Sequence, residues 1–255
     1  MTGLPRALLD RPIAHRGFHG PGRPENSVSA GLSAAKRGFG IEIDVQLSGD
    51  GQAMVFHDAT LDRMTGESGD IRARNAADLE TIPLAGSDET ISSLAAFLGE
   101  INGQVPVLIE IKDQSGVLGP GDTAIEQSVA AAIVAAGARE TVAVMSFNPE
   151  SVAKMADLLP NIPRGLVTDP FSPTEWTDVP QARLAHLRDM ADYDRVSAQF
   201  ISHNAKDLDA PPVASVRAKG GAVLCWTIRS PAEEATARRF ADNVTFEGYD
   251  PDSVP

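Results

Sequence analysis

Short apolar runs that suit β-strands alternate with helical patterns along almost the whole chain. Strands are predicted at residues 12–15, 40–47, 105–112, 142–146, 164–168, 196–200, 222–227 and 243–246. Helices are predicted between them, at residues 24–37, 91–98, 122–136, 149–158, 180–191, 205–219 and 231–240. Such alternation predicts parallel strands joined by right-handed helical crossovers. Eight units in 255 residues match the size of a (β/α)8 TIM barrel, which is an α/β fold.

An open, doubly wound sheet is the alternative arrangement for this alternation. It predicts a Gly-x-Gly-x-x-Gly phosphate loop after the first strand, and the sequence has none there. No linker or low-complexity tract divides the chain, so we expect a single domain over residues 1–255. The polar, weakly periodic stretch from about residue 60 to 90 indicates a small insertion after the second strand.

The charge and composition of the chain argue against several classes of protein function. The net charge of −13 argues against binding to nucleic acids or to anionic membrane surfaces. The single cysteine, Cys225, excludes an internal disulfide. Residues 1–11 contain no apolar core of signal-peptide length, and no run approaches the length of a membrane span. We therefore expect a cytoplasmic enzyme without stable membrane association.

The second predicted strand carries two carboxylates on one face. Glu42 and Asp44 alternate with apolar residues, and period-two alternation places both on the same side of the strand. Turn residues at 48–51 then return the chain to His57 and Asp58. If that return is extended, Asp58 points away from His57 and does not orient it. Two like charges on a buried face repel each other unless a cation or a proton compensates them.

The third strand repeats this design, with Glu110 and Lys112 opposite apolar neighbours. In a (β/α)8 barrel, catalytic groups lie at the carboxyl ends of the strands. His15 ends the first strand, and Trp226 ends the seventh. Three carboxylates without an obligatory cysteine form an oxygen-rich set, which Mg²⁺ and Ca²⁺ prefer over zinc.

Simpler interpretations of the same residues stay open. The carboxylates could form ion pairs inside the barrel with Arg16 and Lys112, and His15 could be structural. Trp226 fits the core as well as it fits a substrate wall. His19 and His203 are in predicted loops and are expected to be exposed, and His186 is expected on a helix surface.

Several short motifs occur in one order along the chain. They are His15-Arg-Gly, Pro24-Glu-Asn-Ser, Glu42-Ile-Asp-Val with His57-Asp58, Glu110-Ile-Lys, Ser146-Phe-Asn-Pro and Cys225-Trp-Thr. Together they resemble the glycerophosphodiester phosphodiesterase family, from Ile13 to about Phe246. The resemblance implies a barrel with a small insertion after the second strand. It also implies a hydrolase of lipid and glycerol metabolism, which cleaves glycerophosphodiesters to glycerol 3-phosphate and an alcohol.

The resemblance extends to individual residues. Glu42, Asp44 and Glu110 look like the ligands of a divalent metal, Mg²⁺ or Ca²⁺. His15 and His57 look like the acid–base pair, Arg16 and Lys112 look like phosphate contacts, and Trp226 is a candidate substrate contact. The family's usual final helix has no counterpart after residue 246, so we expect a shortened C-terminus in which this helix is missing or is supplied by the N-terminal segment or by a partner subunit.

Other functions remain as alternatives. A lysophospholipase D-like phosphodiesterase would share the chemistry but act on one-chain lipids. A non-enzymatic phosphodiester-binding protein would have lost a histidine or a carboxylate, whereas all are present here. An enolising Mg²⁺-dependent barrel would not explain the two histidines beside Arg16. The expected partner is a small glycerophosphodiester substrate, and a homo-oligomer is left open.

Overall fold

The structure of the protein is a computed structural model, of which residues 4–253 are described. Its strands form one sheet in the order β1-β10-β9-β8-β7-β6-β5-β2-β3-β4, and β1 also pairs with β2. This order is that of a closed parallel barrel with helices between the strands, and it confirms the predicted (β/α)8 fold. The strands are β1 (Ile13–Ala14), β2 (Gly40–Leu47), β3 (Ala53–Val55), β4 (Ser92–Ser93), β5 (Val107–Ile111), β6 (Val142–Ser146), β7 (Arg164–Thr168), β8 (Phe200–Asn204), β9 (Ala222–Ile228) and β10 (Asn243–Phe246).

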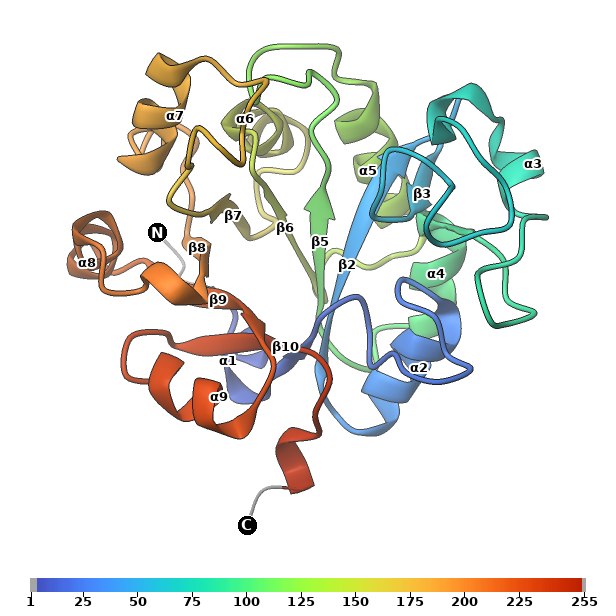
Figure 1. Ribbon diagram of the computed structural model, residues 1–255, viewed down its shortest axis with the longest axis horizontal. Helices are drawn as coiled ribbons and strands as arrows, with labels where there is room; N and C mark the ends of the chain where they lie inside the picture. The colour runs from blue at the N-terminus through green and yellow to red at the C-terminus, as the bar shows by residue number, and fades with distance from the viewer. Residues whose placement is uncertain (1–3, 254–255) are drawn as a thin grey trace. The chain divides into compact units, whose positions relative to one another are not determined.

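Helices and strands alternate along most of the chain, which can be followed by the colours of Figure 1. They are α1 (Ala7–Asp10), α2 (Val28–Lys36), α3 (Ala76–Leu79), α4 (Leu94–Ile101), α5 (Ala124–Ala135), α6 (Pro149–Leu158), α7 (Gln181–Arg188), α8 (Pro211–Ala218) and α9 (Pro231–Ala237). Short 3₁₀ helices lie at Ile71–Ala73, Ala205–Asp207 and Pro251–Ser253. None of the helices in this described part of the chain is long and apolar enough to cross a membrane.

The chain divides into two compact units. One contains Ala14–Lys112 and Thr123–Val142, and the other contains the described residues up to Ile13, Asp113–Asp122 and those from Ala143 onward. In the first unit β2 and β5 are parallel neighbours (Figure 1), with Asp44 opposite Glu110. Ile41, Ile43 and Val45 of β2 are completely buried, and helices α2 and α5 contact this strand. Apolar packing on one face therefore fixes the strand whose other face carries the carboxylates.

The insertion after β3 has a small apolar core of its own. Met54 and Phe56 pack with residues of the insertion, namely Leu61, Ile71, Ala76, Leu79, Ile82, Leu84 and Ile91. Asp70 begins the first 3₁₀ helix by accepting a hydrogen bond from the backbone of Arg72. The polar stretch of the sequence is thus an ordered segment anchored to β3 by buried side chains.

In the second unit, β7, β8, β9 and β10 are successive parallel neighbours. The N-terminal segment lies against the last strand, because Asn243 donates hydrogen bonds to the carbonyls of Leu8 (2.9 Å) and Arg11 (2.7 Å). Arg11 also pairs with Asp252 at 2.7 Å. Among the alternatives expected for the end of the barrel, these contacts agree with the N-terminal segment.

The predicted position of the sixth parallel strand was wrong. Residues 196–199 lie outside the strand and include Ser197 at φ +52°, and β8 runs instead from Phe200 to Asn204. His203 is consequently a strand residue, only 1% exposed, and not a residue of an exposed loop. Its Nδ1 atom lies 2.8 Å from the hydroxyl of Thr168. The apolar residues before Phe200 had shifted the predicted strand toward the N-terminus.

Candidate active site

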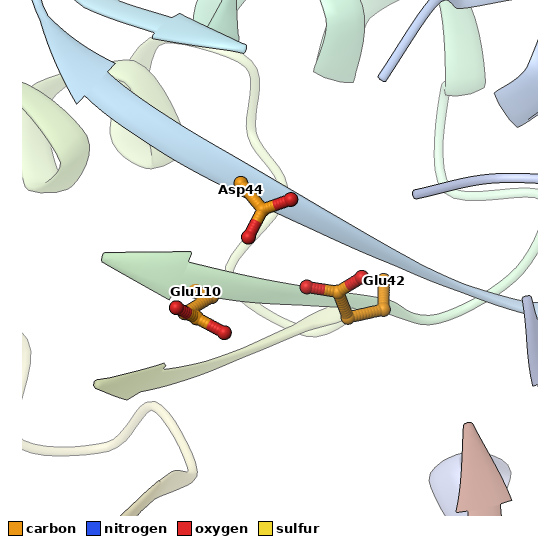
Figure 2. A group of neighbouring side chains, drawn as sticks. All are labelled: Glu42, Asp44 and Glu110. Carbon is orange, nitrogen blue, oxygen red and sulfur yellow. The ribbon is translucent and has the colours of Figure 1, made fainter. Parts of the chain in front are cut away.

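Three carboxylates meet on neighbouring strands of the first unit. Glu42 and Asp44 come from β2 and Glu110 comes from β5, and Figure 2 shows their side chains converging on one space. Each offers an oxygen atom, and these oxygens all lie within 4.8 Å of one another. Glu42 and Asp44 are 1% exposed and Glu110 is 7% exposed. The period-two alternation of β2 and its register with β5 produce this cluster.

The cluster has an electrostatic cost that is visible at Glu42. Burial and the neighbouring charges of Asp44 and Glu110 raise the pKa of Glu42 well above its usual value. Asp44 behaves in the opposite way: burial would raise its pKa, but Lys112, His57 and Arg16 lower it well below the usual range. The strands thus concentrate negative charge that the surrounding cations compensate unevenly.

Lys112 lies between two of the carboxylates. Its Nζ atom is 2.7 Å from Oδ1 of Asp44 and 2.6 Å from Oε1 of Glu110. Burial lowers the pKa of Lys112, but the two carboxylates outweigh it and raise that pKa above its ordinary value. The ammonium group is therefore charged, and the ion pairs considered for Lys112 from the sequence are formed.

Arg16 approaches the cluster from the loop after β1. Its backbone N–H donates to Glu42 Oε2 at 2.9 Å, and its Nε lies 3.3 Å from Asp44 Oδ2. Its Nη1 donates to Oε1 of Glu25 at 2.7 Å. Arg16 has φ +54°, a left-handed conformation in which the backbone and the side chain both reach carboxylates. Like Lys112, it also forms the ion pairs that were considered as the simpler interpretation.

Asn26 fixes one of the carboxylates. Its Nδ2 donates to Asp44 Oδ2 at 2.9 Å, and its Oδ1 accepts a hydrogen bond from the Asp44 backbone at 3.1 Å. Asn26 is 2% exposed and has φ +57°. The Pro24-Glu-Asn-Ser motif is part of the family resemblance, but no role was predicted for Glu25 or Asn26. The signal was the motif itself, which precedes a helix whose N-cap is Ser27.

The two predicted histidines belong to the same unit. The Nε2 atom of His15 lies 4.0 Å from Oε2 of Glu42. His57 follows β3, and its Nδ1 lies 2.5 Å from Oδ1 of Asp58. The expectation that Asp58 points away from His57 was wrong, because β3 ends at Val55 and the chain is no longer extended at residues 57–58. Burial, Lys112 and Arg16 lower the pKa of His57, and the charge of Asp44 only partly opposes them.

The residues of the cluster suit a hard divalent cation. Ligand oxygens around one Mg²⁺ or Ca²⁺ lie about 2.0–2.6 Å from the ion, so they are separated by no more than roughly 5 Å. The spacing of the three oxygens meets this limit. Burial and the charges of Asp44 and Glu110 raise the pKa of Glu42, and a cation among the three carboxylates would oppose this rise. The donor set contains only carboxylates, which these cations favour.

Trp226 belongs to the other unit, on β9. Its ring centroid lies 5.7 Å from that of Phe147, which also contacts Phe171 and Trp176. The indole N–H donates to the carbonyl of Ser202 at 2.9 Å. Trp226 is half-buried, so its ring is neither fully in the core nor fully exposed. Its proposed contact with substrate remains a prediction.

Comparisons with known proteins agree with one family. The sequence profile of the glycerophosphoryl diester phosphodiesterase family matches residues 15–248. The YhdW protein of Bacillus subtilis strain 168 is 29% identical over 226 residues, which are 86% of each chain. A glycerophosphodiester phosphodiesterase of Caldanaerobacter subterraneus subsp. tengcongensis is 34% identical over 164 residues, which are 61% of this chain and 65% of that protein.

A solved structure is similar over nearly the whole length. It is an Oleispira antarctica phosphodiesterase in complex with the product sn-glycerol-3-phosphate. It is 26% identical, with a TM-score of 0.75, and the match covers 95% of this chain and 94% of that one. Because the family profile spans almost the entire barrel, this chain belongs to the glycerophosphoryl diester phosphodiesterase family.

Proposed function

We propose that this protein hydrolyses glycerophosphodiesters to glycerol 3-phosphate and an alcohol, with a divalent metal ion as cofactor. One observation carries the proposal: three buried carboxylates, two cationic side chains and two histidines are gathered in one unit of a barrel of this family. The Oleispira antarctica relative, which was solved with sn-glycerol-3-phosphate, supports the same product class.

Glu42, Asp44 and Glu110 would hold the metal ion. When bound, such a cation neutralises the charge of the phosphodiester and can also bind a hydroxyl group. Mg²⁺ and Ca²⁺ are the proposed ions, because all three donors are carboxylates. Asn26 keeps Asp44 in its orientation through two hydrogen bonds, so that one ligand is positioned before any ion arrives.

Arg16 and Lys112 would contact the phosphate oxygens. The guanidinium of Arg16 can form a bidentate contact, whereas the ammonium of Lys112 acts as a point charge. In the free protein both are paired with carboxylates of the cluster. A cation at the carboxylates would compete for those pairs, which makes both side chains available to an anionic substrate.

His15 and His57 would divide the proton transfers. The proposed assignment is that His15 accepts a proton from the nucleophile and His57 protonates the leaving oxygen. The nucleophile is a water molecule or the substrate's own glycerol hydroxyl. Because Nδ1 of His57 is bonded to Asp58, its Nε2 is the nitrogen left for transfer. An anionic diester beside Arg16 and Lys112 would offset their charge and favour the protonated form of His57.

The test measures release of glycerol 3-phosphate from glycerophosphocholine and glycerophosphoethanolamine, and release of lysophosphatidic acid from lysophosphatidylcholine. The purified protein is first treated with a chelator, and Mg²⁺, Ca²⁺ or Zn²⁺ is then added back. The proposal predicts release from the deacylated diesters only after Mg²⁺ or Ca²⁺ is restored. Glu100→Gln, at an exposed position of α4, serves as the control for Glu42→Gln. Full activity in excess chelator would contradict the metal assignment, and release from the one-chain lipid alone would contradict the substrate class.

A further inference from the structure

We infer that Arg63, a residue of the insertion after β3, is a positioning residue that holds the acid–base histidine and the phosphate-binding arginine through two carboxylates. The inference rests on the proposed function, because that function gives His57 and Arg16 their roles in catalysis and phosphate binding. It gives the insertion, which has an apolar core of its own, a role in positioning the active-site residues.

One guanidinium group serves both carboxylates. Nε of Arg63 donates to Asp58 Oδ2 at 2.6 Å, and its Nη2 donates to Asp58 Oδ1 at 3.0 Å. On the other side, Nη2 donates to Glu25 Oε1 at 2.7 Å, and Nη1 donates to Glu25 Oε2 at 3.1 Å. The planar fork of an arginine can hold two carboxylates in fixed positions in this way.

Each of these two carboxylates also contacts a residue of the proposed mechanism. Asp58 lies 2.5 Å from Nδ1 of His57, and Glu25 accepts from Nη1 of Arg16 at 2.7 Å. The result is a continuous chain of contacts from His57 through Asp58, Arg63 and Glu25 to Arg16. Arg63 is its middle member and touches neither His57 nor Arg16 in any contact found among the described residues, so it would act only through the two carboxylates.

The charges explain why an arginine is needed at this place. The hydrogen bonds that Arg63 donates to Glu25 and Asp58 raise its pKa, so it remains a cation. Burial would raise the pKa of Asp58, but the bonds from Arg63 and His57 lower it to about 2. Without Arg63, two ionised carboxylates would face each other, and each would depend on its single remaining partner.

The fold itself depends little on this arginine. The side chain of Arg63 is 46% exposed, and half-exposed ion pairs contribute little to stability. Its backbone lies between Leu61, which is fully buried, and Met64, which packs against the core of the insertion. Apolar packing therefore keeps the insertion in place, and replacing Arg63 should disturb Asp58 and Glu25 without unfolding the chain.

The experiment compares Arg63→Met and Arg63→Lys with a matched control, Arg74→Met. Arg74 is also in the insertion, is 41% exposed and pairs with Glu67, outside the chain of contacts. Each variant is assayed on glycerophosphocholine and on a nitrophenyl diester of glycerol 3-phosphate, which needs no acid for its leaving group. Arg63→Met should lose roughly tenfold to a hundredfold in kcat on glycerophosphocholine and only about threefold on the nitrophenyl diester, since general-acid catalysis contributes about 10²–10⁴-fold.

Two further results follow from the same chain of contacts. Arg63→Lys should recover part of the rate, because it keeps the charge but loses the fork. The double variant Arg63→Met with Asp58→Asn should be about as slow on glycerophosphocholine as the slower single variant, because both changes break one path to His57. Arg74→Met should match the wild type on both substrates.

A readout without turnover separates this inference from the proposed function. In protein labelled with ¹⁵N-histidine, the Nδ1 proton of His57, assigned with His57→Gln, should shift or broaden in Arg63→Met and stay in place in Arg74→Met. If the wild type releases no glycerol 3-phosphate, the proposed function fails and this spectrum alone decides the inference. Wild-type rates of Arg63→Met on both substrates, additive effects in the double variant, or an unchanged His57 signal in Arg63→Met would each overturn it.

Discussion

Nδ1 of His57 lies 2.5 Å from Oδ1 of Asp58, although the two residues are adjacent in sequence. Adjacent side chains meet in this way only where the backbone leaves the extended conformation, as it does after β3. The ionised carboxylate makes Nδ1 the donor and fixes the plane of the imidazole ring. The pair therefore presents Nε2 of His57 in one tautomer, which a proton-transferring group requires.

Asp58→Asn should lower kcat on glycerophosphocholine by roughly tenfold to a hundredfold, the range seen when a partner that orients a functional histidine is lost. The amide keeps the size of the side chain but can offer either an oxygen or an N–H group to Nδ1, so the tautomer is no longer fixed. Steady-state kinetics at a saturating metal concentration measures the effect. Asp62→Asn, at an exposed position of the same segment, is the control. Unchanged kcat in Asp58→Asn would mean that the bond to His57 has no part in catalysis.

The two histidines can be distinguished by their leaving-group dependence. A poor alkoxide leaving group needs an acid, whereas a nitrophenolate leaves without one. His57→Ala should therefore lose about 10²-fold or more on glycerophosphocholine and much less on a nitrophenyl diester, within the range of general-acid catalysis. His15→Ala should fail on both, because the nucleophile is no longer activated. The reverse pattern would exchange the two roles, and equal losses in both variants would argue against any division.

The barrel could be predicted because its signal is local and repeated. Apolar strands and helical periods alternate along the chain, and the carboxylates of β2 follow from a period of two. The strand predicted at residues 196–200, which the structure places at Phe200–Asn204, shows the limit of that signal. Val196 and Ala198 are buried as a strand would bury them, yet neither lies in a strand, so burial alone does not identify the conformation.

The network around Arg63 could not have been predicted in the same way. Arg63 and Glu25 are 38 positions apart, and their contact depends on how the insertion folds back. Sequence periodicity says which face a residue occupies, but it does not say which side chain of a distant loop will meet it. The direction of the Asp58 side chain was predicted wrongly for a related reason, because it depends on the residue at which β3 ends.

Glu42→Gln should separate metal affinity from folding. Removing one negative charge relieves repulsion from Asp44 and Glu110, so the chelated variant should be at least as stable as the chelated wild type. A ligand at a hundred times its Kd stabilises a protein by about 2.7 kcal/mol, and the variant should show less than half of this gain when Mg²⁺ or Ca²⁺ is added. Thermal unfolding with and without the ion measures both effects. An equal shift of Tm in Glu42→Gln and in the wild type would remove Glu42 from the ligand set.

Lys112→Met tests phosphate recognition against a purely structural ion pair. The change should raise KM and lower kcat, because a charge contact to phosphate can strengthen in the transition state. Inhibition by glycerol 3-phosphate should weaken by roughly tenfold, which corresponds to about 1.4 kcal/mol. Lys36→Met, at an exposed position of α2, should leave KM, kcat and the inhibition by glycerol 3-phosphate unchanged. If the inhibition constant of Lys112→Met equals that of the wild type, Lys112 only balances the charges of Asp44 and Glu110.

His203 should make stability depend on pH, independently of the active site. It is buried on β8, and burial lowers its pKa, an effect that the nearby carboxylates of Asp207 and Asp169 oppose only in part. The folded protein therefore resists protonation at this position, whereas the unfolded chain takes up a proton near pH 6.5. Between pH 6.5 and the lower pKa of the folded state, the unfolded state binds more protons, so the free energy of unfolding falls as the pH is lowered.

The slope from His203 alone is at most about 1.4 kcal/mol for each pH unit. His203→Gln loses the bond between Nδ1 and the Thr168 hydroxyl, so it should be less stable than the wild type at pH 7.5. Its stability should nevertheless fall less steeply than that of the wild type between pH 7.5 and pH 5.5. Urea unfolding at several pH values gives both curves. Parallel curves would show that His203 is protonated equally in both states, and a steeper curve for the variant would show that burial does not govern its titration.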